Sequence, residues 1–229
     1  MKKLFYVLVM LPFLGCTTNG QEDQWVDLFD GETLNGWSIH SGTSEYRVED
    51  GMIIGNTVKG SPNTFLCTDQ EYADFILEFE VLLDEGLNSG VQFRSQIAPE
   101  ELTMWFNNNE GEPFARTIPK DRVYGYQVEI AEGGPAGGIY DEARRAMIRP
   151  WWIEDGSEAS KAFKNGEWNK YRVECRGQSI RTFVNGVLCA DIRDAMTPSG
   201  IIGLQVHQVP DDAPVYEVRW KNIRLLPLD

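Results

Sequence analysis

The sequence lacks most of the features by which the common enzyme and membrane classes are recognised. Its 229 residues include only four cysteines and two histidines. No segment shows a sustained apolar period of 3.6 residues, so little helix is expected. The apolar run from Leu4 to Leu14 is too short to span a bilayer, which takes about 20 residues. The GxSxG, HExxH, P-loop and dinucleotide motifs are absent, which leaves proton transfer by carboxylates or histidine as the available chemistry.

The cysteines do not form a disulfide framework. Cys67, Cys175 and Cys189 lie beyond the N-terminal region and lack the paired spacing of a metal cluster. Hairpin turns at 177–178 and 185–186 would place Cys175 and Cys189 two strands apart, about 9–10 Å from each other. That separation is beyond the reach of a disulfide. We therefore predict three buried free thiols.

Basic residues are scarce relative to acidic ones. Lys and Arg total 21 against 35 Asp and Glu, which gives a formal net charge of -14. Phosphates would be repelled by such a chain, so nucleic acid and anionic membrane surfaces are excluded as main partners. The charged fraction of 24% and the hydrophobic fraction of 42% are typical of a globular protein.

The first residues have the pattern of a bacterial lipoprotein signal. Lys2 and Lys3 form a basic start, an apolar stretch follows, and Gly15-Cys16 ends it. Cleavage before Cys16 would make this cysteine the lipid-modified N-terminus; an ordinary secretory signal is the alternative. We expect an exported protein, lipid-anchored to a bacterial outer membrane on its periplasmic or cell-surface side. The predicted organisation is a lipoprotein signal peptide at 1–15, a tether at 16–24 and a single domain at 25–229.

Short segments of alternating apolar and polar residues recur throughout the remaining chain. Residues 74–83 and 90–96 are examples, and turn signals separate such segments. Many short strands with little helix predict an antiparallel sandwich or barrel. Two connections, 97–123 and 131–167, are long for a compact domain, and their aromatic residues argue for functional rather than disordered loops.

Three of the expected strands carry pairs of hydrogen-bonding residues two positions apart. Residues at i and i+2 of a strand point to the same face of a sheet. If the three strands share a sheet, six polar side chains converge on one face. A solvated sheet face is the alternative, but glutamines combined with Arg, Glu and His fit a sugar-binding site better. The pairs are Gln92 and Arg94, Gln127 and Glu129, and Gln205 and His207.

A second group of charged residues follows the glycine-rich turn after Glu129. This group would border the same cleft if its loop folds back over the sheet. Trp105, Trp151 and Trp152 lie in the two long connections and would stack on sugar rings or fix their own loops. The charged group comprises Tyr140, Asp141, Glu142, Arg144 and Arg145.

Several short blocks of the sequence together resemble a known family, the 3-keto-disaccharide hydrolase domain. This resemblance implies an all-β fold, a concanavalin A-like jelly roll of two antiparallel sheets with long loops over the concave face. It also implies a secreted or lipid-anchored carbohydrate enzyme. Similar sequences often carry an Asp after the Glu-Ile pair, where this chain has Ala131. The blocks are FDGETLNGW (29–37), NSGVQFRS (88–95), YGYQVEI and GGIYDEARR (124–145), NGEWNKYRVECRG (165–177), FVNG (183–186), GIIGLQVHQ (200–208) and KNIRLL (221–226).

The resemblance implies a glycoside or oligosaccharide substrate that is already oxidised at C3. The ketone acidifies the C2 proton, so a base can remove it and the C1 oxygen can leave by elimination, after which water adds back. No cofactor is required, although a divalent cation held by Glu129 and His207 would polarise the ketone. The expected roles are Glu129 or His207 as base, Arg94 as oxyanion partner, Asp141 or Glu142 as acid, and Gln92, Gln127 and Gln205, with Tyr140, Arg144, Arg145, Trp105, Trp151 and Trp152, as sugar contacts.

Two other functions compete with this interpretation. An ordinary glycoside hydrolase of the same fold needs two carboxylates flanking the bond that is cleaved. The relevant strand reads QVEIAE and has only Glu129 on the inward face, which weakens that alternative. A non-catalytic carbohydrate-binding lipoprotein would need the aromatic residues and glutamines, but neither Glu129 nor Arg94.

Overall fold

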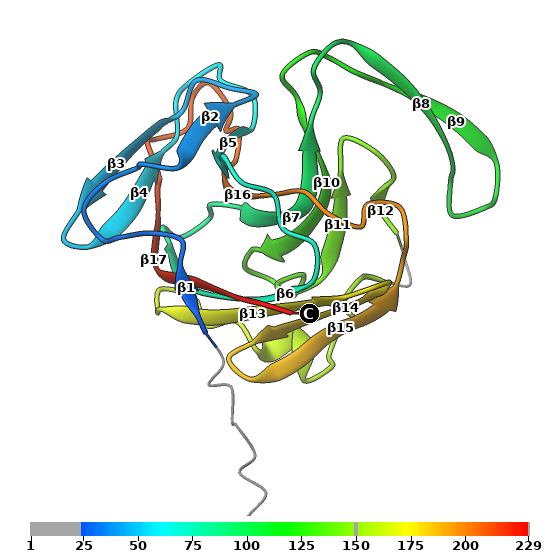
Figure 1. The fold of residues 1–229 in the computed structure, drawn as a ribbon. Coiled ribbons are helices and arrows are strands. Elements are labelled where there is room, and N and C mark those ends of the chain that lie inside the picture. The colour runs from blue at the N-terminus through cyan, green and yellow to red at the C-terminus, as the bar shows by residue number, and fades with distance from the viewer. Residues whose placement is uncertain (1–23, 149–150, 229) are drawn as a thin grey trace, which may run out of the picture.

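The computed structural model describes residues 24–148 and 151–228. The chain forms two large antiparallel sheets packed face to face, and a separate two-stranded hairpin projects from one side (Figure 1). The prediction of an all-β sandwich of two antiparallel sheets is confirmed. The N-terminal predictions, namely the signal peptide, lipidation at Cys16 and most of the tether, fall outside the described residues.

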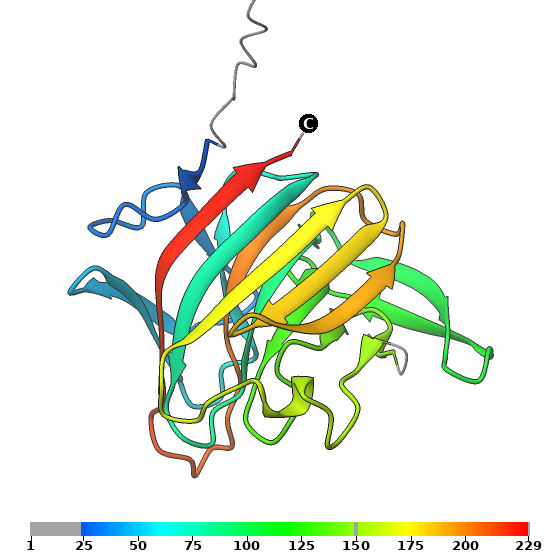
Figure 2. The same cartoon turned by 90° about the horizontal axis from the view of Figure 1, so that it is seen from below.

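The first sheet has eight strands, seven of them in the order β15-β14-β13-β6-β17-β4-β3, with β1 paired to β17. Figure 2 shows several of these strands side by side across the outer face of the sheet. Their bounds are β1 (Val26–Asp27), β3 (Glu45–Glu49), β4 (Met52–Asn56), β6 (Phe75–Leu83), β13 (Asn169–Arg176), β14 (Ser179–Val184), β15 (Val187–Arg193) and β17 (Glu217–Pro227).

The second sheet has seven strands in the order β12-β11-β10-β7-β16-β5-β2. Strands β8 and β9 form the separate hairpin, and the 3-10 helix η2 covers Ala159–Lys161. The remaining bounds are β2 (Trp37–His40), β5 (Thr64–Thr68), β7 (Ser89–Ile97), β8 (Leu102–Asn107), β9 (Pro113–Ile118), β10 (Val123–Ile130), β11 (Ile139–Glu142), β12 (Ala146–Met147) and β16 (Ile201–Val206).

The core lies between the two sheets and follows from the alternation in each strand. In β6, Phe75, Leu77 and Val81 are fully buried, while the side chains between them are half-buried on the outer face. From the facing sheet, Phe93 and Tyr126 stack with ring centroids 5.7 Å apart. Burial of large apolar side chains from both inner faces is the main force that holds the sandwich together.

A β-bulge interrupts β7 at Arg94. Phe93 pairs with Tyr126 and Gln96 pairs with Tyr124, so two residues of β7 lie opposite Gly125 alone. Arg94 has a φ of 47°, in the left-handed region that a non-glycine residue rarely occupies. A Cβ atom on Gly125 would lie 2.5 Å from the Ser95 hydroxyl, so glycine is required opposite the bulge. The bulge reverses the direction of the Arg94 side chain.

The two connections that were expected to be irregular contain strands. Residues 97–123 hold the β8–β9 hairpin, which is closed by a turn at Asn108–Gly111. Residues 131–167 contribute β11 and β12, which extend the second sheet beyond β10. Neither was predicted, because these strands are short and lack a clean apolar alternation.

The three thiols beyond the N-terminal region are free, as predicted. Cys67 and Cys175 are buried, whereas Cys189 is only half-buried. Within the described part of the chain, no helix has the length and apolar character needed to cross a membrane.

Candidate functional site

The outer face of the second sheet carries a group of buried polar side chains. Gln92 of β7 lies directly across from Gln127 of β10, and Glu129 follows two positions later on the same face. Gln205 lies on the neighbouring β16. These four side chains are between 0% and 6% exposed. We call the face formed by Gln92, Gln127, Glu129, Tyr140, Glu142 and Gln205 the polar face.

A chain of hydrogen bonds ends at the Glu129 carboxyl group. The Ser95 hydroxyl donates to Gln92 Oε1 at 2.7 Å, and Gln92 Nε2 donates to Gln127 Oε1 at 2.6 Å. Gln127 Nε2 then donates to Glu129 Oε1 at 2.8 Å. We call this series the amide chain. Gln92 and Gln127, predicted as sugar contacts, therefore use much of their hydrogen-bonding capacity to orient Glu129.

Glu129 has a strongly perturbed acidity. Burial raises the pKa of Glu129 from 4.5 to about 7, the nearby Glu142 adds to this, and hydrogen bonds from Gln127 and Asn88 oppose it. A carboxylate with a pKa near the working pH is suited to accept a proton and return it. Of the residues predicted from sequence, Glu129 is the strongest candidate for a general base.

Glycine at position 90 makes room for the amide chain. Gly90 pairs with Glu129 across the two strands. A Cβ atom at this position would lie 2.4 to 2.6 Å from the side chain of Gln127. Gln127 therefore occupies the space above Gly90, and from there it reaches the carboxyl group of Glu129.

Strand β11 brings Tyr140 and Glu142 to the polar face. Tyr140 lies opposite Gln127 in the sheet, and Glu142 follows two positions later. Arg122 Nη2 donates to Glu142 in a close ion pair. Burial raises the pKa of Glu142, and the Arg122 guanidinium partly opposes this. Burial, Glu142 and Glu129 raise the pKa of Tyr140, while Arg116 and Arg122 lower it.

The sequence prediction missed Arg122 and Arg116. Both come from the connection between β7 and β10, which was expected to be a loop. Their contacts to β11 are long-range, so no local pattern indicated them. Asn63 was also missed: it hydrogen-bonds Glu142, and its Oδ1 accepts from Gln208 N at 2.9 Å.

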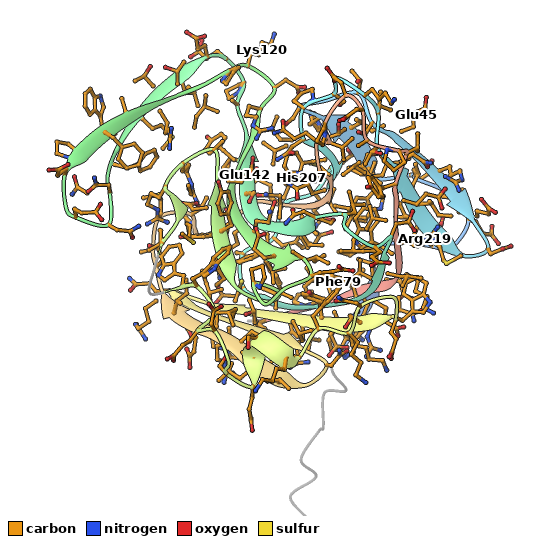
Figure 3. All side chains as sticks on the ribbon, turned by 180° about the vertical axis from the view of Figure 1, so that it is seen from behind. Glu45, Phe79, Lys120, Glu142, His207 and Arg219 are labelled. Carbon is orange, nitrogen blue, oxygen red and sulfur yellow. The ribbon has the colours of Figure 1, made fainter. Side chains whose placement is uncertain are left out.

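His207 lies just beyond the end of β16, half-buried. Figure 3 shows it near Glu142 on one side of the second sheet, with the interior residue Phe79 on the other side. Its Nδ1 is 2.7 Å from the Gln208 carbonyl oxygen. Because that oxygen only accepts, Nδ1 carries the hydrogen and Nε2 keeps its lone pair. Burial lowers the pKa of His207, so it is neutral at pH 7.

Gln205 is buried without hydrogen-bond partners. It is 0% exposed, and neither Oε1 nor Nε2 has a partner within the described residues. A buried amide left unpaired costs about 1–3 kcal/mol. An unpaired amide on the polar face indicates a place where a bound ligand or an ordered water would complete the hydrogen bonding.

The expectation that Arg94 shares this face is wrong. Because of the bulge, its guanidinium crosses towards the first sheet and is only 1% exposed. It pairs with Asp74 at 2.6 Å and donates to the carbonyl oxygens of Ala73 and Gly177. Arg94 therefore ties the two sheets together and is not placed to stabilise an oxyanion beside Glu129.

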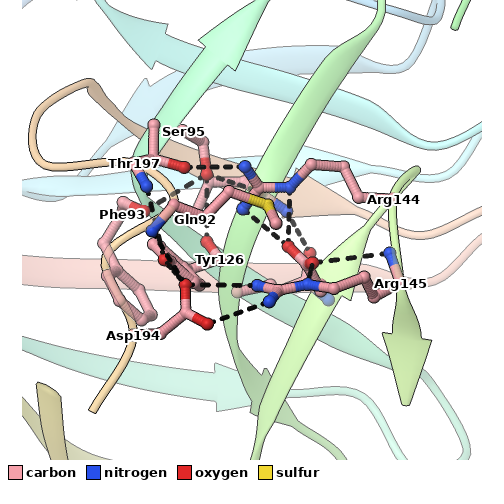
Figure 4. Close-up of polar contacts among 11 residues, drawn as sticks. Gln92, Phe93, Ser95, Tyr126, Arg144, Arg145, Asp194 and Thr197 are labelled. Carbon is pink, nitrogen blue, oxygen red and sulfur yellow. Dashed lines mark hydrogen bonds and ion pairs between the residues drawn. The ribbon is translucent and has the colours of Figure 1, made fainter. Parts of the chain in front are cut away.

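Asp141, Arg144 and Arg145 are also separated from Glu129. Asp141 pairs with Tyr126 in the sheet and so lies on the face opposite Glu142. It accepts from Arg144 Nε at 2.8 Å and pairs with Arg145, while Arg145 also contacts Asp194 at 2.9 Å (Figure 4). These residues form a buried ionic network at the edge of the sandwich, not a border of the polar face as predicted.

The three tryptophans predicted as stacking platforms have different surroundings. Trp151 is buried, its ring centroid lies 6.1 Å from that of Tyr126, and Arg145 lies over its face at 4.7 Å. Trp152 is half-buried. Trp105 is 71% exposed on the β8–β9 hairpin. Of the three, only Trp105 presents most of its surface to solvent.

A divalent cation at Glu129 and His207 remains a prediction. Among residues 24–148 and 151–228, no three His, Cys, Asp or Glu side chains lie close enough together to hold a metal ion.

Comparisons with known proteins agree with this architecture. A solved structure of a candidate glycosyl hydrolase from Parabacteroides distasonis superposes with a TM-score of 0.58 at 17% identity, covering 90% of this chain and 94% of the other. A Bacillus subtilis protein with a galectin-like fold gives a TM-score of 0.51 at 8% identity, covering 89% of this chain and 98% of the other. At these identities the likeness shows the fold alone, and it confirms the jelly-roll prediction.

Sequence comparison gives the family. A 3-keto-disaccharide hydrolase from Bacteroides thetaiotaomicron is 27% identical over 162 residues, covering 66% of this chain and 52% of that protein. The chain thus spans about half the length of this curated relative. The model of the 3-keto-alpha-glucoside-1,2-lyase-like domain matches residues 24–226. The protein belongs to the 3-keto-alpha-glucoside-1,2-lyase-like domain family, as its resemblance to 3-keto-disaccharide hydrolases predicted.

Proposed function

We propose that this protein cleaves the glycosidic bond of 3-keto-glycosides, with Glu129 as the base that removes the C2 proton. The observation that carries the proposal is the buried Glu129 carboxyl group, oriented by the amide chain and with its pKa raised to about 7. Removal of a proton next to a ketone requires a positioned base with a pKa near the working pH. Family membership supports a carbohydrate substrate.

Arg122 takes the role that the sequence had suggested for Arg94. When the C2–H bond breaks, negative charge develops on the C3 oxygen, and a fixed cation stabilises it. Arg122 is held by Glu142 on the face that carries Glu129. Gln205, whose amide is unpaired, and His207 are assigned to the sugar hydroxyl groups.

The leaving oxygen also needs a proton. As the C1–O bond breaks, its electron pair goes to this oxygen, and a double bond forms between C1 and C2. We assign the proton to the Tyr140 hydroxyl, because its raised pKa keeps it protonated and Glu142 is engaged with Arg122. Water then adds its hydroxyl to C1 and gives its remaining proton to the Tyr140 phenolate. Glu129 returns the first proton to C2, which gives a free 3-keto sugar and restores both side chains.

The test compares a 3-keto-glucoside with the same glucoside before oxidation. Release of sugar from the keto compound alone, with exchange of the C2 proton in D2O, is the expected result. Cleavage of the plain glycoside would indicate an ordinary glycoside hydrolase. Binding without product would indicate a carbohydrate-binding protein. If product forms without C2 exchange at any stage, the elimination step is wrong.

Gln205→Met is expected to separate stability from binding. The substitution keeps the side-chain length and removes a buried unpaired amide, so the free energy of unfolding should rise by about 1–3 kcal/mol. The loss of hydrogen bonds to the substrate should raise KM by about tenfold. Chemical denaturation and steady-state kinetics measure the two effects.

Gln70→Met provides the matched control, because Gln70 is exposed at the end of β5 and lies outside the polar face. Gln70→Met should change neither the free energy of unfolding nor KM. A Gln205→Met variant with lower stability and unchanged KM would mean that the amide is paired through water and does not contact the substrate.

The lipid anchor at Cys16 and the outer-membrane location remain part of the proposal. Such an anchor would hold the enzyme where imported or extracellular glycosides are processed. Metabolic labelling with a palmitate analogue, compared between the full chain and Cys16→Ala, tests it directly, and equal labelling of the two would contradict it.

A further inference from the structure

The β8–β9 hairpin, residues 102–118, stands away from both sheets as an arm (Figure 1). Its strands pair with each other, and Trp105 near the middle of β8 is 71% exposed. Most of the apolar ring of Trp105 faces water, so its burial does not stabilise the fold. An exposed tryptophan on a projecting hairpin is typical of a side chain that contacts a ligand.

Two hollows border this arm, with volumes of about 550 Å³ and 430 Å³. Asn107 and Arg145 line both, so the two hollows adjoin. Each is large enough for a sugar unit, since small-molecule sites usually range from about 300 to 1,000 Å³.

The lining of the hollows combines aromatic rings with amide groups. Aromatic rings cover the apolar face of a pyranose, and side-chain amides pair with its hydroxyl groups. An apolar lipid chain would not match this polar lining, and a nucleic acid would be repelled by the net charge of -14. The aromatic and apolar residues are Trp105, Phe114, Trp151 and Met196, and the amides are Asn107, Asn108 and Asn109.

Arg116 connects the first hollow with the polar face. It lines the 550 Å³ hollow, and its Nε donates to the Arg144 carbonyl oxygen at 3.3 Å. It is also close enough to Tyr140 to lower the pKa of that hydroxyl. Asn109, which lines the same hollow, donates to the carbonyl oxygen of Met147 at 3.2 Å, and Met147 is the strand partner of Tyr140. The hollow therefore lies next to the strand that carries Tyr140.

Side chains from the segment before β10 contact β2 and β5 on the far side of the second sheet from β11. Asp121 pairs with His40 of β2 at 2.6 Å, and Arg122 lies over the ring of Phe65 on β5. Beneath this segment Phe65 packs with Val123 and Ile201 in a small apolar cluster. We therefore orient the sugar chain, which starts above Glu129, away from these side chains and towards the arm.

We infer that the arm and its two hollows bind a pyranose unit on the leaving-group side of the substrate, with Trp105 as the stacking platform. The assignment of the arm to the leaving-group side of the substrate rests on the proposed function. Oligosaccharides, rather than glycosides with small leaving groups, are then the preferred substrate class.

Trp105→Ala tests the inference with two substrates, methyl 3-keto-glucoside and a 3-keto tetrasaccharide of glucose. Loss of one stacking contact should lower kcat/KM for the tetrasaccharide by about tenfold and leave the methyl glycoside unchanged. Leu188→Ala, which removes a similarly exposed apolar side chain from β15, is the control and should change neither value.

Equal loss on both substrates, or no loss on either, would overturn the inference. If no keto-glycoside is cleaved, the proposed function fails, and calorimetric titration with unoxidised neutral tetrasaccharides of glucose, galactose and mannose tests the arm by itself. Binding to the wild-type chain that weakens in Trp105→Ala would support a sugar site. No binding, or equal binding by both proteins, would overturn it.

Discussion

Glu129→Gln is expected to lower kcat for a 3-keto-glycoside by about 10²- to 10⁴-fold, the range that a positioned general base contributes. Glutamine has the same shape, and its oxygen can still accept the hydrogen bond from Gln127 Nε2. The protein should therefore fold normally and bind substrate with nearly unchanged KM. Exchange of the C2 proton in D2O should fall by a similar factor, which ties the loss to proton removal.

Glu45→Gln, at an exposed position on β3, is the matched control and should keep full activity. If Glu129→Gln retains C2 exchange at the normal rate, the base is another residue, and His207 with its Nε2 lone pair is the next candidate.

The raised pKa of Glu129 predicts how kcat/KM and stability change with pH. For the wild type, kcat/KM should rise as Glu129 loses its proton, with a midpoint near pH 7. Because the folded pKa lies above the ordinary 4.5, the folded state holds this proton more tightly than the unfolded chain. That contribution to stability is complete below pH 4.5 and is lost as the pH rises to about 7, by at most about 1.4 kcal/mol per pH unit. The Gln variant lacks it, so denaturation curves of the two proteins should diverge across this window.

Asp141→Asn is expected to destabilise the protein by about 3–5 kcal/mol, the cost of removing one partner from a buried ion pair. Asp141 is 0% exposed and pairs with two guanidinium groups, those of Arg144 and Arg145. Asparagine keeps the shape and removes the charge, which leaves excess positive charge in the interior. Chemical denaturation measures the loss.

Asp212→Asn, an exposed change of the same kind, should stay within about 0.5 kcal/mol of the wild type. Because Asp141 faces away from Glu129, the folded fraction of Asp141→Asn should keep most of its activity per molecule. If Asp141→Asn has normal stability but has lost turnover, Asp141 takes part in the reaction, as the sequence analysis predicted.

Much of the fold could be predicted from local sequence, because each strand shows its alternation of apolar and polar residues directly. The same rule placed Gln92, Gln127 and Glu129 on one face. It would also have separated Asp141 from Glu142, since consecutive residues of a strand point to opposite faces, had residues 139–142 been recognised as a strand.

Two parts of the site could not be obtained in this way. Arg94 follows the alternation rule in the sequence and breaks it in the structure, because a bulge with positive φ reverses its side chain. Gly125 opposite it was the only local signal. Arg122 reaches Glu142 from a connection 20 residues away, and such a contact depends on how the arm leaves and rejoins the sheet.

Gly90 takes no part in the chemistry, yet the position of the base depends on it. Its missing side chain is the space that Gln127 fills before reaching Glu129. Any larger residue would displace this glutamine and remove its hydrogen bond to the carboxylate, which would then rely on Asn88. None of the side chains that we assign to the substrate would change. Position 90 is therefore a place where added volume alone is expected to impair the proposed activity, and a survey of reactive side chains would not include it.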